Sequence, residues 1–513
     1  MKKVILIFVL ALLLSFALVA CDDNTPETPV CDHQIVIDEA VPATCVETGL
    51  TEGKHCSVCN TIIVAQETVE ALGHKYDSDC DEACNVCSVE RETTASHMDI
   101  NPIDNSCDFC NAVVDSITFT LSDDGTSYVI SDASDSISGA ITIPSTYNNK
   151  PVTTIGCQAF DSCTSLINIV IPDSVTSIGN QAFYCCYRLT GVIIPNSVTT
   201  IGGYAFNNCT DLTSVVIPDS VTTIGHRAFA SCYSLTSVTI GSGVTTIGKQ
   251  AFYCCDSLTS IVIPDNVTTI GDYAFYECDS LTSIIVDEDN PNYKSIDGNL
   301  YSKDGTILLQ YAIGKLDTTF EIPAGVTTIG GNAFFGCFRL TGVIIPNSVT
   351  TIGDYAFNYC DLTSVVIPDG VTTIGDETFA YCDSLTSIII PDSVTTIGEY
   401  AFLDCKSLTS VTIGSGVTTI GDGAFFGCRS LTSVVIPDSV TIIGEEAFYQ
   451  CDSLTSIIIP DSVTIIGEDA FYSCDSLTDV YFTGTKEEWN NLLIGSYDEF
   501  LTNVTIHYNY VEE

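Results

Sequence analysis

The sequence predicts a β-rich solenoid, a stack of short coils that are nearly copies of one another. One cysteine recurs in step in two runs, and each step within a run is 23 residues except for a step of 22 after Cys360. A fixed period of this length is typical of solenoids, in which each coil buries little by itself and the stack forms one continuous core. Val, Ile, Thr and Ser dominate the repeats, and β-branched residues favour strands. The recurring cysteines are Cys163, Cys186, Cys209, Cys232, Cys255, Cys278, Cys337, Cys360, Cys382, Cys405, Cys428, Cys451 and Cys474.

Each repeat follows the pattern V-T-x-I-G-x-x-A-F-x-x-C-x-S-L-T-S-V-x-I-P-D-S. In one copy, alternation along the strand predicts that Val215 and Ile217 face the core and that Val216 faces outward. Pro218 cannot donate a backbone hydrogen bond, so it ends the strand. The V-T-T-I-G segment predicts a second short strand, closed by a glycine that can adopt a positive φ at a corner. The A-F-x-x-C segment predicts a brief turn or short helix that places Phe and Cys in the core.

The composition excludes several classes of function. The chain has 513 residues, 65 acidic and 16 basic, with a formal net charge of −49. So acidic a chain is not expected to bind nucleic acid, whose phosphates need Lys and Arg, or to dock on an anionic membrane through charge. Because 45% of the residues are hydrophobic, the chain is also not a disordered acidic polymer.

The N-terminus is predicted to be an export signal. Lys2 and Lys3 precede the apolar residues 4–19, and L-V-A-C ends at Cys21. This segment resembles a bacterial lipobox, which implies cleavage before Cys21 and attachment of a diacylglycerol to its sulfur. A plain secretory signal and an uncleaved membrane anchor are the alternatives, although the apolar run is short for a span. Residues 22–30 are polar and contain proline, as a tether would, so the rest of the chain is expected outside the cytoplasm.

Residues 31–113 differ from the repeats because they are rich in cysteine and histidine. They contain nine cysteines, four histidines and three C-x-x-C pairs. This pattern resembles zinc-ribbon or zinc-knuckle spacing and small Cys/His repeats that accompany bacterial surface proteins. One predicted structural zinc site combines Cys45, Cys56 and Cys59 with His33 or His74; a second combines Cys80, Cys84 and Cys87 with a later Cys or His, such as Cys107 or Cys110. Disulfides are the alternative in an exported domain, although nine cysteines cannot all pair within the module.

The repeat I-P-D-S-V-T-T-I-G-x-x-A-F-x-x-C-x-S-L-T-S-V-x-I-P resembles the BspA-like branch of the leucine-rich repeat family over about residues 117–510. Residues 126–160 resemble the family's N-terminal unit, and residues 480–494 with 503–510 resemble its closing unit, where Trp489, the only tryptophan, is expected to seal the stack. The resemblance implies an α/β horseshoe-like leucine-rich repeat fold with short helical turns. It also implies a bacterial surface protein that adheres to host proteins, mucus glycans or other cells.

The resulting organisation has eight parts. They are a lipoprotein signal at 1–20, a tether at 21–30, the Cys/His-rich module at 31–113, an N-terminal opening unit at 114–160, repeats at 152–286, a hairpin insert at 287–325, repeats at 326–479 and a closing unit at 480–513. Within the insert, Asp304–Gly305 is the expected hairpin turn. The acidic run Asp287, Glu288 and Asp289 is interpreted as a solvated turn, because its spacing does not match a calcium loop.

The in-step cysteines are predicted to be small buried core residues, because a nucleophile needs a singular environment and thirteen equivalent sites do not provide one. Three other cysteines, Cys157, Cys185 and Cys254, are expected to be exposed.

Two surfaces are candidates for binding. The first is a β-branched stripe at the outward position of the main strand, made of Val170, Ile193, Val216, Thr239, Val262, Ile285, Ile344, Val366, Ile389, Thr412, Val435 and Ile458. At a strand spacing of about 4.8 Å it is on the order of 60 Å long. It could be a docking face, or it could reflect β-propensity or be covered by the protein's own segments. The second surrounds A-F-x-x-C and carries aromatic residues, which either contact a partner or pack between coils: Tyr184, Tyr187, Tyr204, Tyr253, Tyr273, Tyr276, Phe335, Phe338, Tyr355, Tyr359, Tyr400, Phe426, Tyr449 and Tyr472.

No catalytic motif is present. The sequence has no G-x-S-x-G, H-E-x-x-H or P-loop, and His226 and His507, the two histidines outside the module, have no matching nucleophile. We therefore predict a non-enzymatic, lipid-anchored surface scaffold that binds an extracellular protein or glycan, reaches the membrane through Cys21, and does not bind nucleic acid. The alternative is a passive spacer without a ligand; an enzyme is a third hypothesis, and it would need an unrepeated cluster of residues in a cleft, for instance near the insert.

Overall fold

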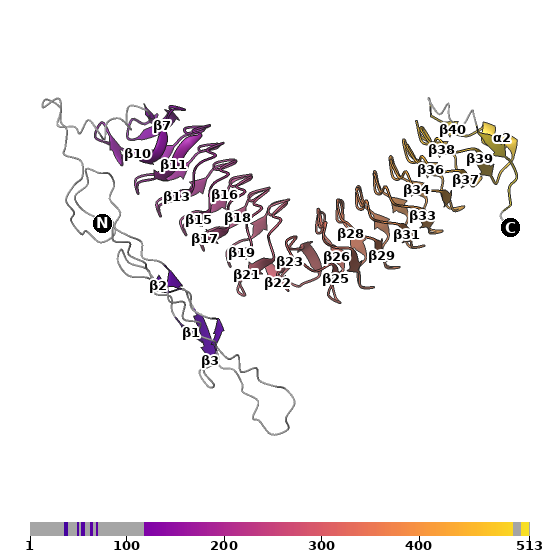
Figure 1. Cartoon of the computed structure of the whole chain (residues 1–513), viewed down its shortest axis with the longest axis horizontal. Helices are drawn as coiled ribbons and strands as arrows, with labels where there is room; N and C mark the ends of the chain where they lie inside the picture. The colour runs from indigo at the N-terminus through magenta and orange to yellow at the C-terminus, as the bar shows by residue number, and fades with distance from the viewer. Residues whose placement is uncertain are drawn as a thin grey trace, which may run out of the picture. The chain divides into compact units, whose positions relative to one another are not determined.

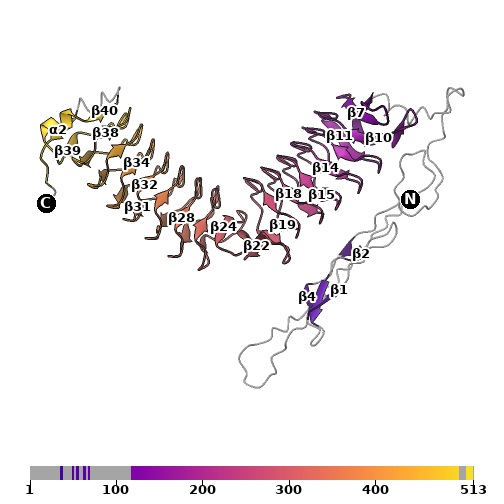
Figure 2. The same cartoon turned by 180° about the vertical axis from the view of Figure 1, so that it is seen from behind.

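A computed structural model describes residues 35–38, 49–50, 53–56, 62–64, 68–69, 117–495 and 504–511, and Figures 1 and 2 show the chain from opposite sides. The chain divides into two compact units, Met1–His97 and Met98–Glu513. In the first unit, β1 (Ile35–Asp38), β3 (Gly53–Cys56) and β4 (Ile62–Val64) form an antiparallel sheet, and β2 (Gly49–Leu50) pairs with β5 (Thr68–Val69).

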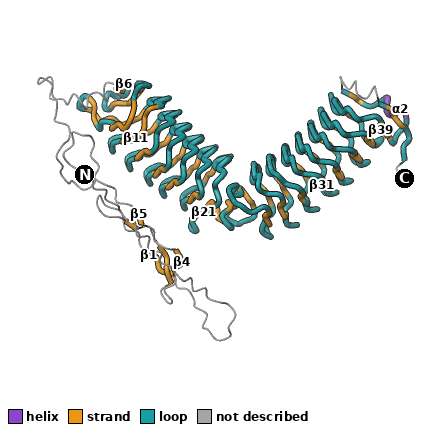
Figure 3. The backbone as a smooth tube through the Cα atoms, viewed as in Figure 1, coloured by secondary structure: helices purple, strands orange, loops and turns teal. Residues whose placement is uncertain are grey.

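The second unit is the solenoid, and Figure 3 shows its strands repeating from coil to coil. One strand of each coil lies on the broad strand face. The members of this face are β8 (Ser138–Thr142), β11 (Ser165–Val170), β13 (Gly191–Ile193), β15 (Ser214–Ile217), β17 (Ser237–Ile240), β19 (Ser260–Ile263), β21 (Ser283–Val286), β25 (Thr319–Glu321), β27 (Gly342–Ile344), β29 (Ser364–Val365), β31 (Ser387–Ile390), β33 (Ser410–Ile413), β35 (Ser433–Val435), β37 (Ser456–Ile459), β39 (Asp479–Phe482) and β41 (Thr505–His507). Parallel pairing on this face forms four successive sheets, β8 to β17, β19 with β21, β25 to β29, and β31 to β41.

A second parallel ladder is formed by the V-T-T-I-G segments. It contains β7 (Tyr128–Ala133), β10 (Lys150–Ile155), β12 (Ser177–Ile178), β14 (Thr200–Ile201), β16 (Thr223–Ile224), β18 (Thr246–Ile247) and β20 (Thr269–Ile270). Within the insert it resumes with β24 (Ile307–Gln310), and it continues with β26 (Thr328–Ile329), β28 (Thr351–Ile352), β30 (Thr373–Ile374), β32 (Thr396–Ile397), β34 (Thr419–Ile420), β36 (Ile442–Ile443), β38 (Ile465–Ile466) and β40 (Leu493–Ile494).

The core is formed by the same repeat residues in every coil. In β15, Val215 and Ile217 are buried and Val216 is exposed, as the alternation predicts. Phenylalanines of successive coils stack, with ring centroids 5.0 Å apart between Phe183 and Phe206 and planes only 8° apart. Each phenylalanine therefore packs against its own copy one coil away, which makes the repeat self-complementary.

The third side of each coil, around A-F-x-x-C, is a run of turns without α-helix. Its backbone alternates: the residues two before and two after the phenylalanine have a positive φ, such as Gln181 at 56° and Cys185 at 57°. The alternation points N–H groups toward the next coil, so that the Phe160 N–H donates to the Ala182 carbonyl at 2.8 Å. The expected short helical turns are therefore hydrogen-bonded turns that tie neighbouring coils together.

The glycine that closes V-T-T-I-G is needed for a different reason from the one the sequence suggested. It does not have a positive φ. Instead, a Cβ added at Gly225 would lie 2.4 Å from the carbonyl carbon of Gly202 in the preceding coil. Stacked coils approach so closely at this corner that no side chain fits there.

The insert combines two hairpins with part of a regular coil. β22 (Tyr293–Ile296) pairs antiparallel with β23 (Asn299–Ser302) through a turn at Asp297 and Gly298, whose φ values are 49° and 73°. β23 pairs with β24 through the predicted turn at Gly305, whose φ is 79°. Both β24 and β25 join the parallel ladders, so the last part of the predicted insert already belongs to the stack.

The two ends are closed differently from the repeats. At the start, β6 (Ile117–Leu121) pairs antiparallel with β7, and β9 (Thr146–Tyr147) pairs with β10. At the other end, α2 (Lys486–Asn490) begins with a capping box between Thr485 and Glu488. It buries Trp489 against Phe482, with ring centroids 5.2 Å apart, which confirms that this tryptophan seals the stack.

Candidate binding surfaces

The predicted stripe lies on the broad strand face and points outward along most of its length. Strand pairing aligns Ile193 with Val216 and aligns Val435 with Ile458, so the stripe follows the ladder from coil to coil. Eleven of the twelve predicted residues are exposed. The exposed valines and isoleucines have from 37% (Val170) to 79% (Val366) of their surface accessible to solvent.

The broad strand face is free of charge along its repeats, which is unusual for a chain with 65 acidic residues. None of the strands from β11 to β21 and from β27 to β37 on this face contains a charged residue. In most repeats a threonine precedes the strand and its hydroxyl bonds the preceding coil, as where Thr213 Oγ1 donates to the Thr190 carbonyl at 3.3 Å. The acidic residues of the repeats therefore lie on the other sides of the coils.

The stripe has one interruption and one closed end that the sequence did not indicate. In β25, pairing places the exposed Glu321 beside Ile344, so a carboxylate occupies the stripe position at the insert. Ile458 is the single predicted residue that is half-buried. The next stripe positions are Tyr481 and His507, whose rings stack at 4.7 Å.

A shallow groove of about 470 Å³ lies at this closed end. Val435, Ile458, Thr483 and Tyr510 contribute to its lining. The Tyr510 N–H donates to the Phe482 carbonyl at 3.1 Å, which holds the final segment beside β39. The closing unit thus covers the last part of the stripe.

The aromatic residues around A-F-x-x-C pack against one another between coils. Tyr359 and Tyr381 stack at 4.3 Å, and Phe426 and Tyr449 stack at 4.6 Å. Tyr276 contacts Phe335 at 4.5 Å, which links the coils on either side of the insert. Among the predicted residues, only Tyr187, Phe338, Tyr359 and Tyr472 are exposed, and the others are half-buried. Packing between coils therefore accounts for much of this aromatic surface.

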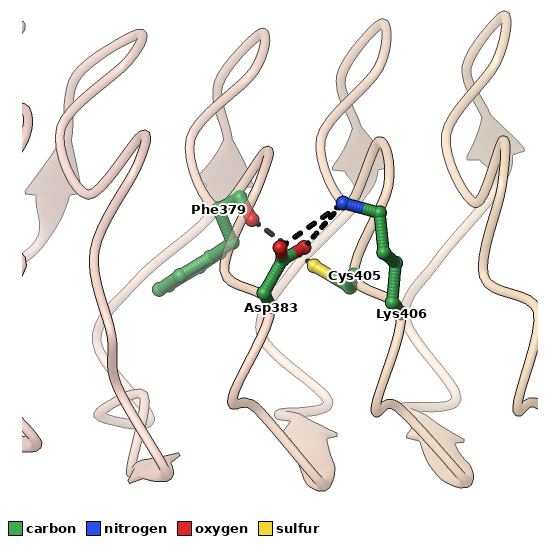
Figure 4. A network of polar contacts seen from close by, with 4 residues as sticks. All are labelled: Phe379, Asp383, Cys405 and Lys406. Carbon is green, nitrogen blue, oxygen red and sulfur yellow. Dashed lines mark hydrogen bonds and ion pairs between the residues drawn. The ribbon is translucent and has the colours of Figure 1, made fainter.

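The in-step cysteines are buried thiols, most of which bond to the same kind of partner, a phenylalanine carbonyl of the preceding coil, as Figure 4 shows for Cys405. Its Sγ lies 3.1 Å from the carbonyl oxygen of Phe379 in the preceding coil, and ten other ladder cysteines repeat this contact at 3.0–3.3 Å. Burial raises the pKa of the Cys232 thiol to about 12. The thiol is therefore a small apolar group that also supplies a donor, which confirms its structural role.

Of the three cysteines outside the ladder, the sequence prediction was right for one and wrong for another. Cys157 is exposed and Cys254 is half-buried, with its Sγ 2.8 Å from a carboxylate oxygen of Glu277. Cys185 is buried against the next coil, where its backbone N–H donates to the Asn207 carbonyl at 2.9 Å. Its Sγ accepts a hydrogen bond from the Asn208 amide at 3.7 Å.

In the second half of the solenoid, an acidic residue directly follows the glycine of G-x-x-A-F in successive coils. Asp376 Oδ1 accepts the backbone N–H of Glu399 at 2.9 Å, and Asp422 Oδ1 accepts that of Glu445 at 2.8 Å. These side chains bond the backbone of the next coil. The ion pair between Lys406 and Asp383 in Figure 4, at 3.0 Å, similarly joins neighbouring coils.

Several predicted residues lie outside the described part of the chain. These are the lipidation site Cys21 and the zinc-ligand candidates His33, Cys45, Cys59, His74, Cys80, Cys84, Cys87, Cys107 and Cys110, while of Cys56 only the backbone of β3 is described. Within the described residues, no group of three or more His, Cys, Asp or Glu side chains could hold a metal ion.

The helices in the described part of the chain are too short or too polar to cross a membrane. Neither of the two remaining histidines shares its surroundings with a nucleophile of the kind a hydrolase uses. His226 contacts Tyr204 and a backbone carbonyl, and His507 Nε2 bonds Asp479 Oδ1 at 2.7 Å. Asp287, Glu288 and Asp289 are exposed, and the Asp289 N–H bonds the Asp287 carboxylate at 3.0 Å in a turn.

Comparison with known proteins identifies the repeat. A family model described as BspA type leucine-rich repeat region matches residues 135–249, 199–308, 311–428 and 372–498. No curated protein matches the chain. A leucine-rich cell surface protein of Faecalibacterium prausnitzii A2-165 is 31% identical, over 74% of this chain and 96% of that one, with a TM-score of 0.45. A leucine-rich repeat protein of Eubacterium ventriosum is 29% identical, over 70% and 93%, with a TM-score of 0.53.

A third solved structure, a leucine-rich repeat protein of Bacteroides ovatus, is 27% identical over 77% of this chain and 99% of that one, with a TM-score of 0.46. These matches cover most of the chain. The chain therefore belongs to the BspA-type leucine-rich repeat family of bacterial surface proteins, a family of non-enzymatic repeat proteins.

Proposed function

We propose that this protein is a lipid-anchored surface scaffold whose broad strand face binds an extracellular protein or glycan. The observation that carries the proposal is a long, exposed and uncharged apolar stripe on a chain with a net charge of −49. Monomeric proteins rarely leave large contiguous apolar patches in water, and such patches mark interaction sites.

The geometry of the face suits a partner that lies along the coils. The stripe residues recur at the strand spacing of about 4.8 Å, so an extended partner would meet the same chemistry at every coil. Glu321 divides the stripe, and the closing unit covers its end beyond Val435. We therefore expect two docking segments, one from Val170 to Ile285 and one from Ile344 to Val435.

The membrane anchor is part of this proposal. The lipobox-like L-V-A-C segment ending at Cys21 supports lipidation of that cysteine. Mass spectrometry of the mature N-terminal peptide should show a diacylglycerol-modified cysteine, and Cys21→Ala should release the protein from the membrane fraction. An unmodified Cys21 in the mature protein would contradict the anchor.

We also propose that the Cys/His-rich module holds structural zinc through the candidate ligands between His33 and Cys110. Thiolate and imidazole ligands in C-x-x-C pairs fit zinc, which would supply a fixed crosslink in place of a larger core. Elemental analysis of the purified chain should find about two zinc ions per chain. Metal-free protein with paired cysteines would instead establish the disulfide alternative.

The scaffold proposal is tested by measuring binding of the purified protein to an array of matrix proteins, mucins and glycans at two salt concentrations. Binding through the uncharged stripe should be saturable and should change little with salt, because screening acts on charges. If no ligand saturates, the passive spacer becomes the better account. Turnover of any arrayed glycan or protein would contradict the non-enzymatic assignment.

A further inference from the structure

Three basic residues lie on two neighbouring coils of the turn side. His226 and Arg227 follow the glycine of one coil, and Lys249 follows the glycine of the next. Tyr204 belongs to the preceding coil, and Tyr253 belongs to the same coil as Lys249. Lys249 is exposed, and the other side chains of this group are half-buried, so the cluster forms an accessible and partly enclosed surface.

The arrangement of this cationic cluster is fixed by its own contacts. His226 Nδ1 lies 2.7 Å from the Lys249 carbonyl oxygen, and because a carbonyl can only accept, Nδ1 carries the proton. His226 Nε2 lies 3.1 Å from the Tyr204 hydroxyl. The Arg227 guanidinium carbon lies 5.8 Å from the Tyr204 ring centroid and 5.7 Å from that of Tyr253. Its Nε donates to Gln250 Oε1 at 2.8 Å.

The two permanent cations have no carboxylate partner. Among the described residues, no acidic side chain lies within 4.0 Å of Arg227 or Lys249. Lys249 Nζ instead lies 5.7 Å from the Tyr273 ring centroid. Aromatic rings attract cations without neutralising them, so the charges stay available to an anion. Lys406, by contrast, is paired with Asp383 at 3.0 Å.

The coils before the cluster are close to neutral, whereas Asp272 and Glu277 lie in the coil that follows it. Residues 151–255 contain four acidic residues and three basic ones, whereas residues 326–479 contain nineteen and three. At physiological salt, charges farther away than about 8 Å are largely screened. An anion at the cluster would therefore experience the two permanent cations, Arg227 and Lys249, together with the nearby carboxylates of Asp272 and Glu277, while the more distant acidic residues are largely screened.

We propose that the cationic cluster is a binding site for an acidic sugar, separate from the broad strand face. Arg227 and Lys249 would hold the carboxylate, since charge-assisted hydrogen bonds to carboxylates are strong and directional. The tyrosines offer an apolar ring with a polar tip, which suits a pyranose with one hydrophobic side and a rim of hydroxyls. Two permanent cations are too few for a nucleic acid, which is typically held by many phosphate contacts.

The test measures binding of the full chain to a hexasaccharide of galacturonic acid and to its methyl ester, by calorimetry. The acid should bind, and the ester, which has the same rings without the charges, should not. Arg227→Gln and Lys249→Gln should each weaken binding at least about tenfold, which corresponds to about 1.4 kcal/mol. Lys249 is exposed, so its variant is expected to fold normally.

Matched variants separate this site from its alternatives. Lys406→Gln removes a cation from the acidic half, and Val366→Lys alters the strand face; both should leave hexasaccharide binding unchanged. Equal binding of acid and ester, or an equal loss with Lys406→Gln, would overturn the proposal. So would the absence of any binding to the acid. Tighter binding of a twelve-residue thymidine oligonucleotide, lost in the same two variants, would reassign the cluster to nucleic acid.

Discussion

At the scale of the residue, the ladder cysteine has two roles in one small group. Cys405 fills the core beside the stacked phenylalanines and supplies a donor for the Phe379 carbonyl, which is otherwise remote from water. The core position of this residue was predictable from its step along the sequence. Its partner was not, because the contact joins a thiol to a backbone group 26 residues earlier in the chain.

The thiol ladder predicts loss of stability in alkali. Burial raises the pKa of Cys232 to about 12 from an ordinary value near 9. Because the folded-state pKa lies above the unfolded one, the stabilisation is complete below about pH 9 and is lost as the pH rises toward 12. The urea midpoint, followed by circular dichroism, should fall steeply above pH 9, and less steeply for Cys232→Val. A midpoint that stays constant up to pH 11 would contradict this role.

The positive φ values on the turn side predict that β-branched substitutions are poorly tolerated at these positions. Gln158 is exposed and has a φ of 60°, a conformation that β-branched residues strongly disfavour. Gln158→Val should destabilise the protein by about 1–2 kcal/mol, whereas Gln158→Gly should have little effect. Urea unfolding of the two variants compares them directly, and equal stability would show that the local conformation is not required.

At the scale of the element, the coil is defined by its corners as much as by its strands. The strand alternation and the proline stop were readable in the sequence because they depend on neighbouring residues. The reason for the closing glycine was not, because it depends on the coil above. Neither the burial of Cys185 nor the carboxylate at Glu321 was foreseen, since both depend on how one coil is placed against the next.

The close approach at the corner predicts a position-specific effect of adding one methyl group. Gly225→Ala would place a Cβ about 2.4 Å from the Gly202 backbone and should cost about 1–3 kcal/mol or more. Gly191 has open space around its Cβ position, and serine occupies the equivalent place in the next coil at Ser214. Gly191→Ala is therefore the matched control, and thermal unfolding should leave it unchanged. Equal melting of both variants would exclude crowding at the corner.

At the scale of the whole solenoid, the insert divides the stack into two hydrophobic cores. One core includes residues up to Leu300, and the other begins at Tyr301. The hydroxyls of Tyr301 and Tyr311 are buried without a partner at this junction. Such groups weaken an interface, so coupling between the two cores should be lower than within either of them. The sequence located the insert by its length but did not show this division.

Two cores predict two unfolding transitions. Trp489 lies in the second core and is the only tryptophan, so its fluorescence reports that core alone. Circular dichroism reports both cores together. We expect the two signals to separate in a urea titration, because two-state unfolding requires coincident transitions. Superimposable curves for both signals would show that the solenoid unfolds as one cooperative unit.

The central claim is that the uncharged strand face is the binding surface, and one comparison tests it most directly. The affinity of the full chain for its best arrayed ligand is measured for the native protein, for Ile389→Lys on the stripe and for Tyr449→Lys on the turn side. The account predicts at least a tenfold loss for Ile389→Lys, because a buried unpaired charge at an interface is costly, and little change for Tyr449→Lys. Unchanged affinity for Ile389→Lys with a loss for Tyr449→Lys would contradict it and place the binding surface on the turn side.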